Sequence, residues 1–260
     1  MTLTKTRSIS IPTLTLAASA ICIATFVTCY SISVANGDMQ YPYYFLSSSL
    51  DFSPASCFGS FGLSPVSFLL PIIGWVRYEQ VREVTKSKVN RVMVVSTFVS
   101  AIGAHGVASF QAHNWMLVHL FFAFLFFGGG LLVVGSVVVT DHFCSGFGTV
   151  LMRNYRRFAA VMVGCCLASM GVVAVLFVGL GGECGDVCQK AQFVNAVFEI
   201  TVMVLMLSFY VSFIPEFRGW KFRVIIERGE EGEGRLDLDV DWLRGLGGLE
   251  ELAEPLKNSV

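Results

Sequence analysis

The chain has 260 residues, of which 54% are hydrophobic and only 14% are charged, and its formal net charge is −1. Ordinary soluble proteins carry about a quarter charged residues, so this composition excludes a soluble globular protein. The hydrophobic residues are gathered in blocks, which indicates membrane-spanning segments.

Six blocks contain almost no charge and are about as long as a membrane is thick. A helix needs about 20 residues to cross roughly 30 Å of hydrocarbon at 1.5 Å per residue. In chain order the blocks are 9–34, 58–76, 92–110, 115–140, 158–180 and 193–214. The alternation typical of a membrane barrel is absent. We therefore predict an all-α polytopic membrane protein with six transmembrane helices.

The basic residues predict the orientation of these helices, because Lys and Arg favour the cytoplasmic side. The two chain ends and the loops 77–91 and 141–157 carry 17 of the 18 basic residues, and the opposite side carries only Lys190. We therefore expect both termini in the cytosol. The first block is about 25 residues long, well beyond the h-region of a signal peptide, and is predicted to be a retained helix.

The last part of the chain differs from the membrane domain in composition. We expect residues 1–217 to form the transmembrane domain and 218–260 to form a cytosolic tail. The tail is basic from 218 to 228 and acidic from 230 to 254. Its basic half is expected near anionic lipid headgroups, and its acidic half is expected to be repelled by them. Its glycines favour disorder, although the alternation over 236–242 allows a partner-binding strand.

A few ionisable side chains lie inside the blocks, where each costs about 2.5 to 3.5 kcal/mol unless it is paired or hydrated. His105, His119 and Glu199 are all predicted roughly 6 to 10 Å below the exoplasmic surface, with Gln111 just above them. Such a group can serve as a hydrogen-bond network that holds three helices, as a lipid or headgroup site, or as an acid/base pair. The structural role is favoured over headgroup binding, and headgroup binding over catalysis.

Neither a fixed-spacing metal motif nor a clear nucleophile accompanies these residues. His105, His119 and Glu199 have the ligand types of catalytic zinc. We nevertheless expect no metal, no cofactor and no nucleic-acid partner.

Small residues recur along two of the predicted helices and indicate close helix packing. Ser100, Ala104 and Ala108 are spaced every fourth residue, and Gly103 and Gly106 thin the same helix. Glycines at 128, 129, 130 and 135 thin the next one. Close packing of these two helices would bring His105 and His119 together.

Three cysteines are predicted on the exoplasmic side, where a disulfide can form in an oxidising compartment. They are Cys57, Cys184 and Cys188. One disulfide is expected, and pairing of Cys57 with one of the other two would tie two loops together, but spacing alone leaves the pair open.

Several short motifs resemble those of the Frag/DRAM/Sfk family, which is also related to the CWH-type N-terminal domain. One runs from Cys57-Phe58-Gly59 to Arg77-Tyr78 with Gln80 and Asn90; a second joins Phe110-Gln111 to His119; the third surrounds Glu199 in the last block. The resemblance extends from about residue 40 to residue 220. The chain departs from the family at Pro54-Ala55, where members usually have Pro-Glu, and at Ile200, where they usually have Trp.

The resemblance implies a six-span protein of lysosomal, Golgi, endoplasmic reticulum or plasma membranes. It also implies a role in autophagy, in phosphoinositide kinase scaffolding or in remodelling the lipid of GPI anchors. Our first hypothesis is a non-enzymatic regulator that binds lipid in the bundle and a cytosolic partner through its tail. The second is a lipid-remodelling protein or subunit using Glu199 and His119 as acid/base partners and His105 to orient them. The third hypothesis, a channel or transporter, is the least favoured. A transport path needs polar residues across the whole membrane, and the predicted cytosolic half of the bundle has almost none.

Overall fold

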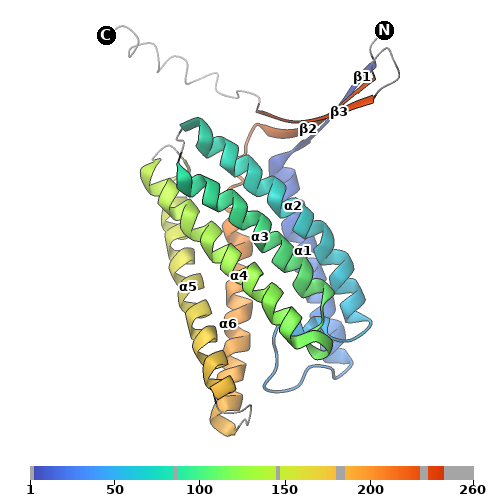
Figure 1. Cartoon of the computed structure of the whole chain (residues 1–260), viewed down its shortest axis with the longest axis vertical. Coiled ribbons are helices and arrows are strands. Elements are labelled where there is room, and N and C mark those ends of the chain that lie inside the picture. Colours follow the sequence, from blue (N-terminus) through green and yellow to red (C-terminus); the bar gives the residue numbers. More distant parts are fainter. Residues whose placement is uncertain (1–2, 85–86, 145–146, 180–184, 229–233, 243–260) are drawn as a thin grey trace. The chain divides into compact units, whose positions relative to one another are not determined.

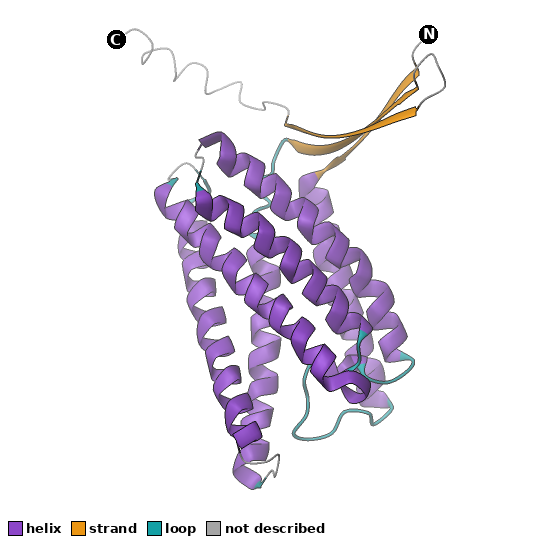
Figure 2. Cartoon of the chain, viewed as in Figure 1, coloured by secondary structure: helices purple, strands orange, loops and turns teal. Residues whose placement is uncertain are grey.

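The computed structural model describes residues 3–84, 87–144, 147–179, 185–228 and 234–242. Clustering of its contacts separates a helical unit, residues 15–213, from a second unit made of residues 1–14 and 214–260. Figure 1 shows the helices and strands in the order of the chain, and Figure 2 shows the long helices in purple and the strands of a small sheet in orange.

The described residues include six helices long and apolar enough to cross a membrane. They are α1 (Ile11–Ala35), α2 (Ala55–Val84), α3 (Lys88–Ser109), α4 (Ala112–Phe143), α5 (Val150–Gly179) and α6 (Asp186–Val211). The six predicted helices are therefore confirmed. Several helices run beyond the predicted blocks, because hydropathy detects the apolar part of a helix and misses polar turns that continue it.

Helices α3 and α4 approach each other more closely than a side chain at the contact would allow. A Cβ atom built on Gly103 would lie 2.3 Å from the backbone nitrogen of Phe126, and one built on Gly129 would lie 2.8 Å from that of Ser100. The hydroxyl of Ser100 donates a 2.9 Å hydrogen bond to the carbonyl oxygen of Phe126 across the contact. The predicted packing of these helices is thus present. Gly128, by contrast, has open space around it.

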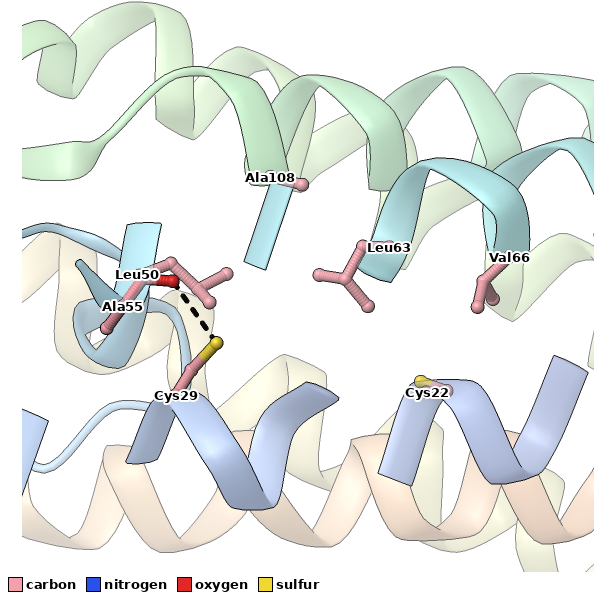
Figure 3. Packing of buried hydrophobic residues seen from close by; sticks show 7 residues of the cluster. All are labelled: Cys22, Cys29, Leu50, Ala55, Leu63, Val66 and Ala108. Atoms are coloured by element: carbon pink, nitrogen blue, oxygen red, sulfur yellow. Dashed lines mark hydrogen bonds between the residues drawn. The ribbon is translucent and has the colours of Figure 1, made fainter. Parts of the chain in front are cut away.

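The loop between α1 and α2, residues 36–54, is folded against the helix ends. It contains the short 3-10 helix η1 (Ser47–Leu50). Figure 3 shows Leu50 and Ala55 beside Cys29 of α1, with Leu63 and Val66 of α2 along the same buried cluster. The Cys29 thiol donates to the carbonyl oxygen of Ala55 at 3.2 Å. Burial of Leu50, which is 2% exposed, holds this loop to the bundle.

The second unit contains a three-stranded antiparallel sheet in the order β1–β2–β3. Its strands are β1 (Leu3–Ser10), β2 (Trp220–Arg228) and β3 (Gly234–Trp242). The sequence favoured an irregular tail but allowed a strand over 236–242, which lies within β3, whereas β1 and β2 were not expected; 229–233 and 243–260 lie outside the described residues.

The register explains why a charged segment can form a sheet. Lys221 lies opposite Asp241, and Arg223 lies opposite Asp239. Residues 234–242 of the acidic half of the tail therefore pair with the basic half, which local composition did not reveal.

Candidate functional site

Glu199 is buried in α6 and holds the loop between α1 and α2. One of its carboxylate oxygens, Oε2, accepts a 2.6 Å hydrogen bond from the backbone N–H of Leu46, and the carboxylate also bonds Ser47 through backbone and side chain. Gln192 and Asn195 precede it by seven and four residues and are buried as well. Residues at this spacing share one helix face. This face of α6 is therefore polar where it meets the loop.

His119 is buried in α4 and closes the turn between α3 and α4. Its Nδ1 lies 2.7 Å from the carbonyl oxygen of Phe110. A carbonyl oxygen can only accept, so the Nδ1–H of His119 is the donor. The backbone of Trp115 (φ −137°, ψ 55°) interrupts the helix between these two residues, so that the first turn of α4 bends at this point.

His105 does not join these residues, although it was predicted at the same depth. It is exposed on α3, and its Nδ1 is 3.4 Å from the hydroxyl of Ser64 in α2. Its ring contacts Phe68, which is 71% exposed. The contacts of His105 are therefore with α2, whereas His119 bonds the carbonyl oxygen of Phe110.

Asp51 is a polar residue of this region that the sequence did not single out. Its Oδ1 accepts hydrogen bonds from the backbone N–H groups of Ala112 at 2.7 Å and His113 at 3.3 Å, the first residues of α4. Gln111 occupies the N-cap position but makes no side-chain capping bond. Burial raises the pKa of Asp51, while the two N–H donors and the imidazoles of His119 and His113 oppose that rise. The unsatisfied N–H groups expected at any helix start were the signal for such an acceptor.

Together these contacts fasten one loop to three helices. Glu199 of α6 binds it at Leu46 and Ser47, α4 binds it through Asp51, and the hydroxyl of Ser33 in α1 donates to the carbonyl oxygen of Ser49 at 2.9 Å. We call this arrangement the loop clamp.

An apolar cavity of about 310 Å³ lies beside the loop clamp. It is formed by α1, the loop and α6, and its lining consists of Tyr30, Tyr44, Phe193, Ala196, Val197 and Ile200. The ring of Tyr44 meets that of Phe193 edge to face, with centroids 6.4 Å apart. Ala196 and Ile200 are the neighbours of Asn195 and Glu199 on α6, so the cavity adjoins the polar face of that helix.

The opposite end of the bundle contains a buried ionic cluster. Asp141 of α4 accepts from Arg77 of α2 at 2.5 Å and from Arg156 of α5 at 2.8 Å. The Nε of Arg156 also donates to the hydroxyl of Ser212 at 2.9 Å. Phe213 lies against both guanidinium groups, at 5.2 and 4.5 Å. This cluster ties α2, α4 and α5 to the end of α6, and the sequence pointed only to its Arg77.

The remaining motif residues support local packing. Gln80 accepts from Arg77 at 3.4 Å, and the side-chain amide of Asn90 donates to the carbonyl oxygen of Tyr78 at 2.8 Å. A Cβ on Gly59 would lie 2.5 Å from Leu50, so this glycine admits the loop. Phe58 is half exposed.

Cysteine pairing differs from one of the alternatives that the sequence allowed. Cys57 carries a free thiol, and Cys188 is disulfide-bonded. Cys57 therefore does not tie the first loop to the α5–α6 connection. Cys184 lies outside the described residues. No group of three or more metal-ligating side chains occurs among the residues that the structure describes.

Comparison with known families assigns the helical bundle. The family model described as the Frag1/DRAM/Sfk1/Cwh43P N-terminal domain matches residues 10–220. The chain belongs to this family. No curated protein and no solved structure shows significant similarity to it. The match includes every residue of the loop clamp and of the ionic cluster, so both lie within the Frag1/DRAM domain.

Proposed function

We propose that this Frag1/DRAM-family protein is a non-enzymatic membrane regulator that holds a lipid beside the loop clamp, in the leaflet predicted to be exoplasmic. The observation that carries the proposal is the apolar cavity next to the polar face of α6. Sites for small molecules span about 300 to 1,000 Å³ and combine apolar walls with a few polar groups. The cavity is at the small end of that range and fits part of an acyl chain.

The neighbouring polar groups favour a headgroup that donates hydrogen bonds. Among the described residues, the Oδ1 of Asn195 is buried and has no hydrogen-bond partner. Such a group costs free energy unless it is satisfied. Asn195 does not itself line the cavity, so a lipid would satisfy this oxygen only with a hydroxyl or ammonium group that reaches past Ala196, while its acyl chain lies along Val197 and Ile200.

The contacts of Glu199 and His119 favour a regulator over an enzyme. Each side chain binds backbone groups of a loop or turn, and the two are not bonded to each other. An acid/base pair must reach a common substrate atom, whereas these groups hold the fold. The regulatory role, in autophagy or in phosphoinositide and lipid homeostasis, would then act through a cytosolic partner of the tail.

Photo-crosslinking tests lipid occupancy. The protein is placed in nanodiscs that contain a phospholipid with a diazirine on its acyl chain, and labelling of the α6 peptide is measured. Ala196→Phe fills the cavity and is expected to reduce this labelling strongly. Val204→Trp is the control, because Val204 is 60% exposed on the same helix outside the cavity. Equal labelling of wild type and Ala196→Phe would refute a bound lipid.

A knockout separates regulation from lipid remodelling. Cellular lipids and GPI-anchor lipids are profiled after rescue with wild type, His119→Ala or Glu199→Gln, each checked for correct membrane location. Full rescue by both variants is expected of a regulator. An anchor-lipid defect that persists with correctly located His119→Ala protein supports the alternative, a GPI-anchor remodelling protein.

A further inference from the structure

A stripe of residues along α6 joins the apolar cavity to the start of that helix. Its members recur at spacings of four and three residues, which place them on one side of a helix. From the helix start they are Asp186, Lys190, Phe193, Val197 and Ile200. The last three line the cavity. Asp186 and Lys190 therefore lie beyond the aromatic end of the cavity, in line with its wall.

Both charges can be reached by a ligand, because Asp186 and Lys190 are exposed. An acid and a base four residues apart on a helix often pair with each other. Within the described parts of the chain, however, neither of these two side chains forms an ion pair. Lys190 is also the only Lys or Arg on the predicted exoplasmic side. The stripe thus ends in one positive and one negative charge.

Aromatic rings beside the cavity indicate the depth of the two charges. The rings of Tyr41 and Tyr44, both from the loop, contact that of Phe193, with centroids 5.8 and 6.4 Å away. Tyrosine is enriched at the level of lipid headgroups. Along the helix axis, Lys190 lies about 4.5 Å and Asp186 about 10.5 Å from Phe193, toward the helix start. Both charges are therefore at headgroup depth.

The order of groups along the stripe matches the order of parts in a zwitterionic phospholipid. Such a lipid has an acyl chain, then a phosphate, then an ammonium group. Ile200 lies about 10 Å deeper than Phe193, so the apolar end of the stripe is at the depth of acyl chains. The base follows nearer the surface, and the acid follows the base. A phosphate at Lys190 and an ammonium group at Asp186 would each meet the opposite charge.

The acid at the outer end favours a primary ammonium group. A primary ammonium donates charge-assisted hydrogen bonds to a carboxylate, as a Lys side chain does, whereas the quaternary ammonium of choline has no N–H to donate. The additional carboxylate of a serine headgroup would bring a like charge toward Asp186. Diacylglycerol has no phosphate for Lys190.

We propose, on the basis of the lipid site proposed above, that the bound lipid is a phosphatidylethanolamine whose phosphate pairs with Lys190 and whose ammonium group pairs with Asp186. These two side chains select the headgroup, and the apolar wall holds an acyl chain. The ammonium group in this position does not reach Asn195, which lies nine residues farther along α6.

Photo-crosslinking with three probes tests the choice of headgroup. The full chain is placed in nanodiscs that contain diazirine-labelled phosphatidylethanolamine, phosphatidylcholine or phosphatidylglycerol with identical acyl chains, and labelling of the α6 peptide is measured. Labelling of the α2 peptide, whose Phe61 and Phe68 are 83% and 71% exposed, corrects for contact with bulk lipid. We expect the ethanolamine probe to label α6 about two- to fivefold more than the other two, as for an exposed ion pair.

Single variants separate the two parts of the headgroup. Lys190→Gln is expected to lower labelling by the ethanolamine and choline probes alike, because both carry the phosphate. Asp186→Asn is expected to abolish the preference for ethanolamine over choline and to leave labelling by the choline probe unchanged.

A charge exchange tests the order of the two groups. Asp186→Lys with Lys190→Asp keeps the net charge and reverses the order, so it is expected to abolish the preference for phosphatidylethanolamine. Glu79→Arg with Arg82→Glu is the matched control, because it exchanges a partly exposed pair at the opposite end of the bundle. This control is expected to retain the preference.

The outcomes distinguish the headgroup from the lipid site itself. Equal labelling by the three probes that falls in Ala196→Phe would overturn the choice of phosphatidylethanolamine and retain a bound lipid. Labelling that depends neither on the probe nor on Ala196→Phe would overturn the lipid site. A preference that survives the exchange of Asp186 and Lys190 would refute the order of contacts. The three probes are compared on the unchanged protein, so this comparison decides even if a variant misfolds.

Discussion

Asp141→Asn is expected to destabilise the helical bundle far more than an ordinary change of one charge. The substitution keeps the shape of the side chain and removes the carboxylate that bonds Arg77 at 2.5 Å and Arg156 at 2.8 Å. All three side chains are almost inaccessible to solvent: Asp141 is 3% exposed, Arg77 is 1% exposed and Arg156 is 0% exposed. Removing one member of a buried ion pair costs about 3–5 kcal/mol, because the remaining charges stay buried.

The expected loss is large enough to measure by thermal unfolding. For a protein of this size, a loss of about 3–5 kcal/mol corresponds to a fall in Tm of roughly 6–20 °C. Tm is measured in one detergent by following the fraction that remains monodisperse after heating. Glu79→Gln is the matched control at the same end of the bundle, since Glu79 pairs at 3.3 Å with Arg82, which is 58% exposed. An exposed pair of this kind contributes about 0–1 kcal/mol.

A second variant distinguishes lost charge from lost shape. Replacing Arg77, Asp141 and Arg156 together by Met, Leu and Met removes the buried charges, and such replacements are often neutral or stabilising. The triple variant is therefore expected to regain much of the Tm lost by Asp141→Asn. A Tm for Asp141→Asn within 2 °C or so of that for Glu79→Gln would refute this reasoning, because a buried ionic cluster must outweigh a surface pair.

Three further predictions concern the helix contact, the loop clamp and the orientation. Gly103→Ala is expected to lower stability by about 1–3 kcal/mol, because its Cβ would meet the backbone of α4, whereas Gly128→Ala, in open space, is expected to be neutral or stabilising; thermal melts compare them. Burial raises the pKa of Asp51 in the folded protein above its unfolded value near 4, so the folded state binds this proton more tightly. That contribution favours folding at low pH and is lost as pH rises through the folded-state pKa, and Asp51→Asn should remove this part of the slope of Tm against pH; parallel curves for the two proteins would contradict it. A C-terminal epitope tag is expected to be digested by protease added to the cytosolic side of sealed membranes, and protection of the tag would reverse the predicted orientation.

Hydropathy predicted the six helices well because it depends on residues that are close together in the chain. Depth along a helix could also be estimated, and it drew attention to Glu199 and His119, which are both buried. The direction in which a side chain points was harder to obtain. His105 lies between Ala104 and Gly106, and a turn of about 100° per residue separates lipid-facing from buried positions there.

The interactions that sequence analysis missed join distant segments. Asp51 caps a helix that begins 61 residues later, and Asp141 meets Arg77 from 64 residues away. Each residue alone resembles an ordinary polar residue at the end of a hydrophobic block. The sheet is in part a similar case, because β1 pairs with β2 from the other end of the chain, whereas β2 and β3 are neighbours in the tail.

The loop clamp has a consequence for how this sequence can diverge. Glu199 binds the backbone N–H of Leu46, and Asp51 binds the backbone N–H groups of Ala112 and His113. Bonds to main-chain atoms do not depend on which side chain the bonded residue carries. Residues at 46, 112 and 113 can therefore change without loss of these bonds, while the two carboxylates cannot. These three positions can therefore vary on a framework that two acidic residues hold.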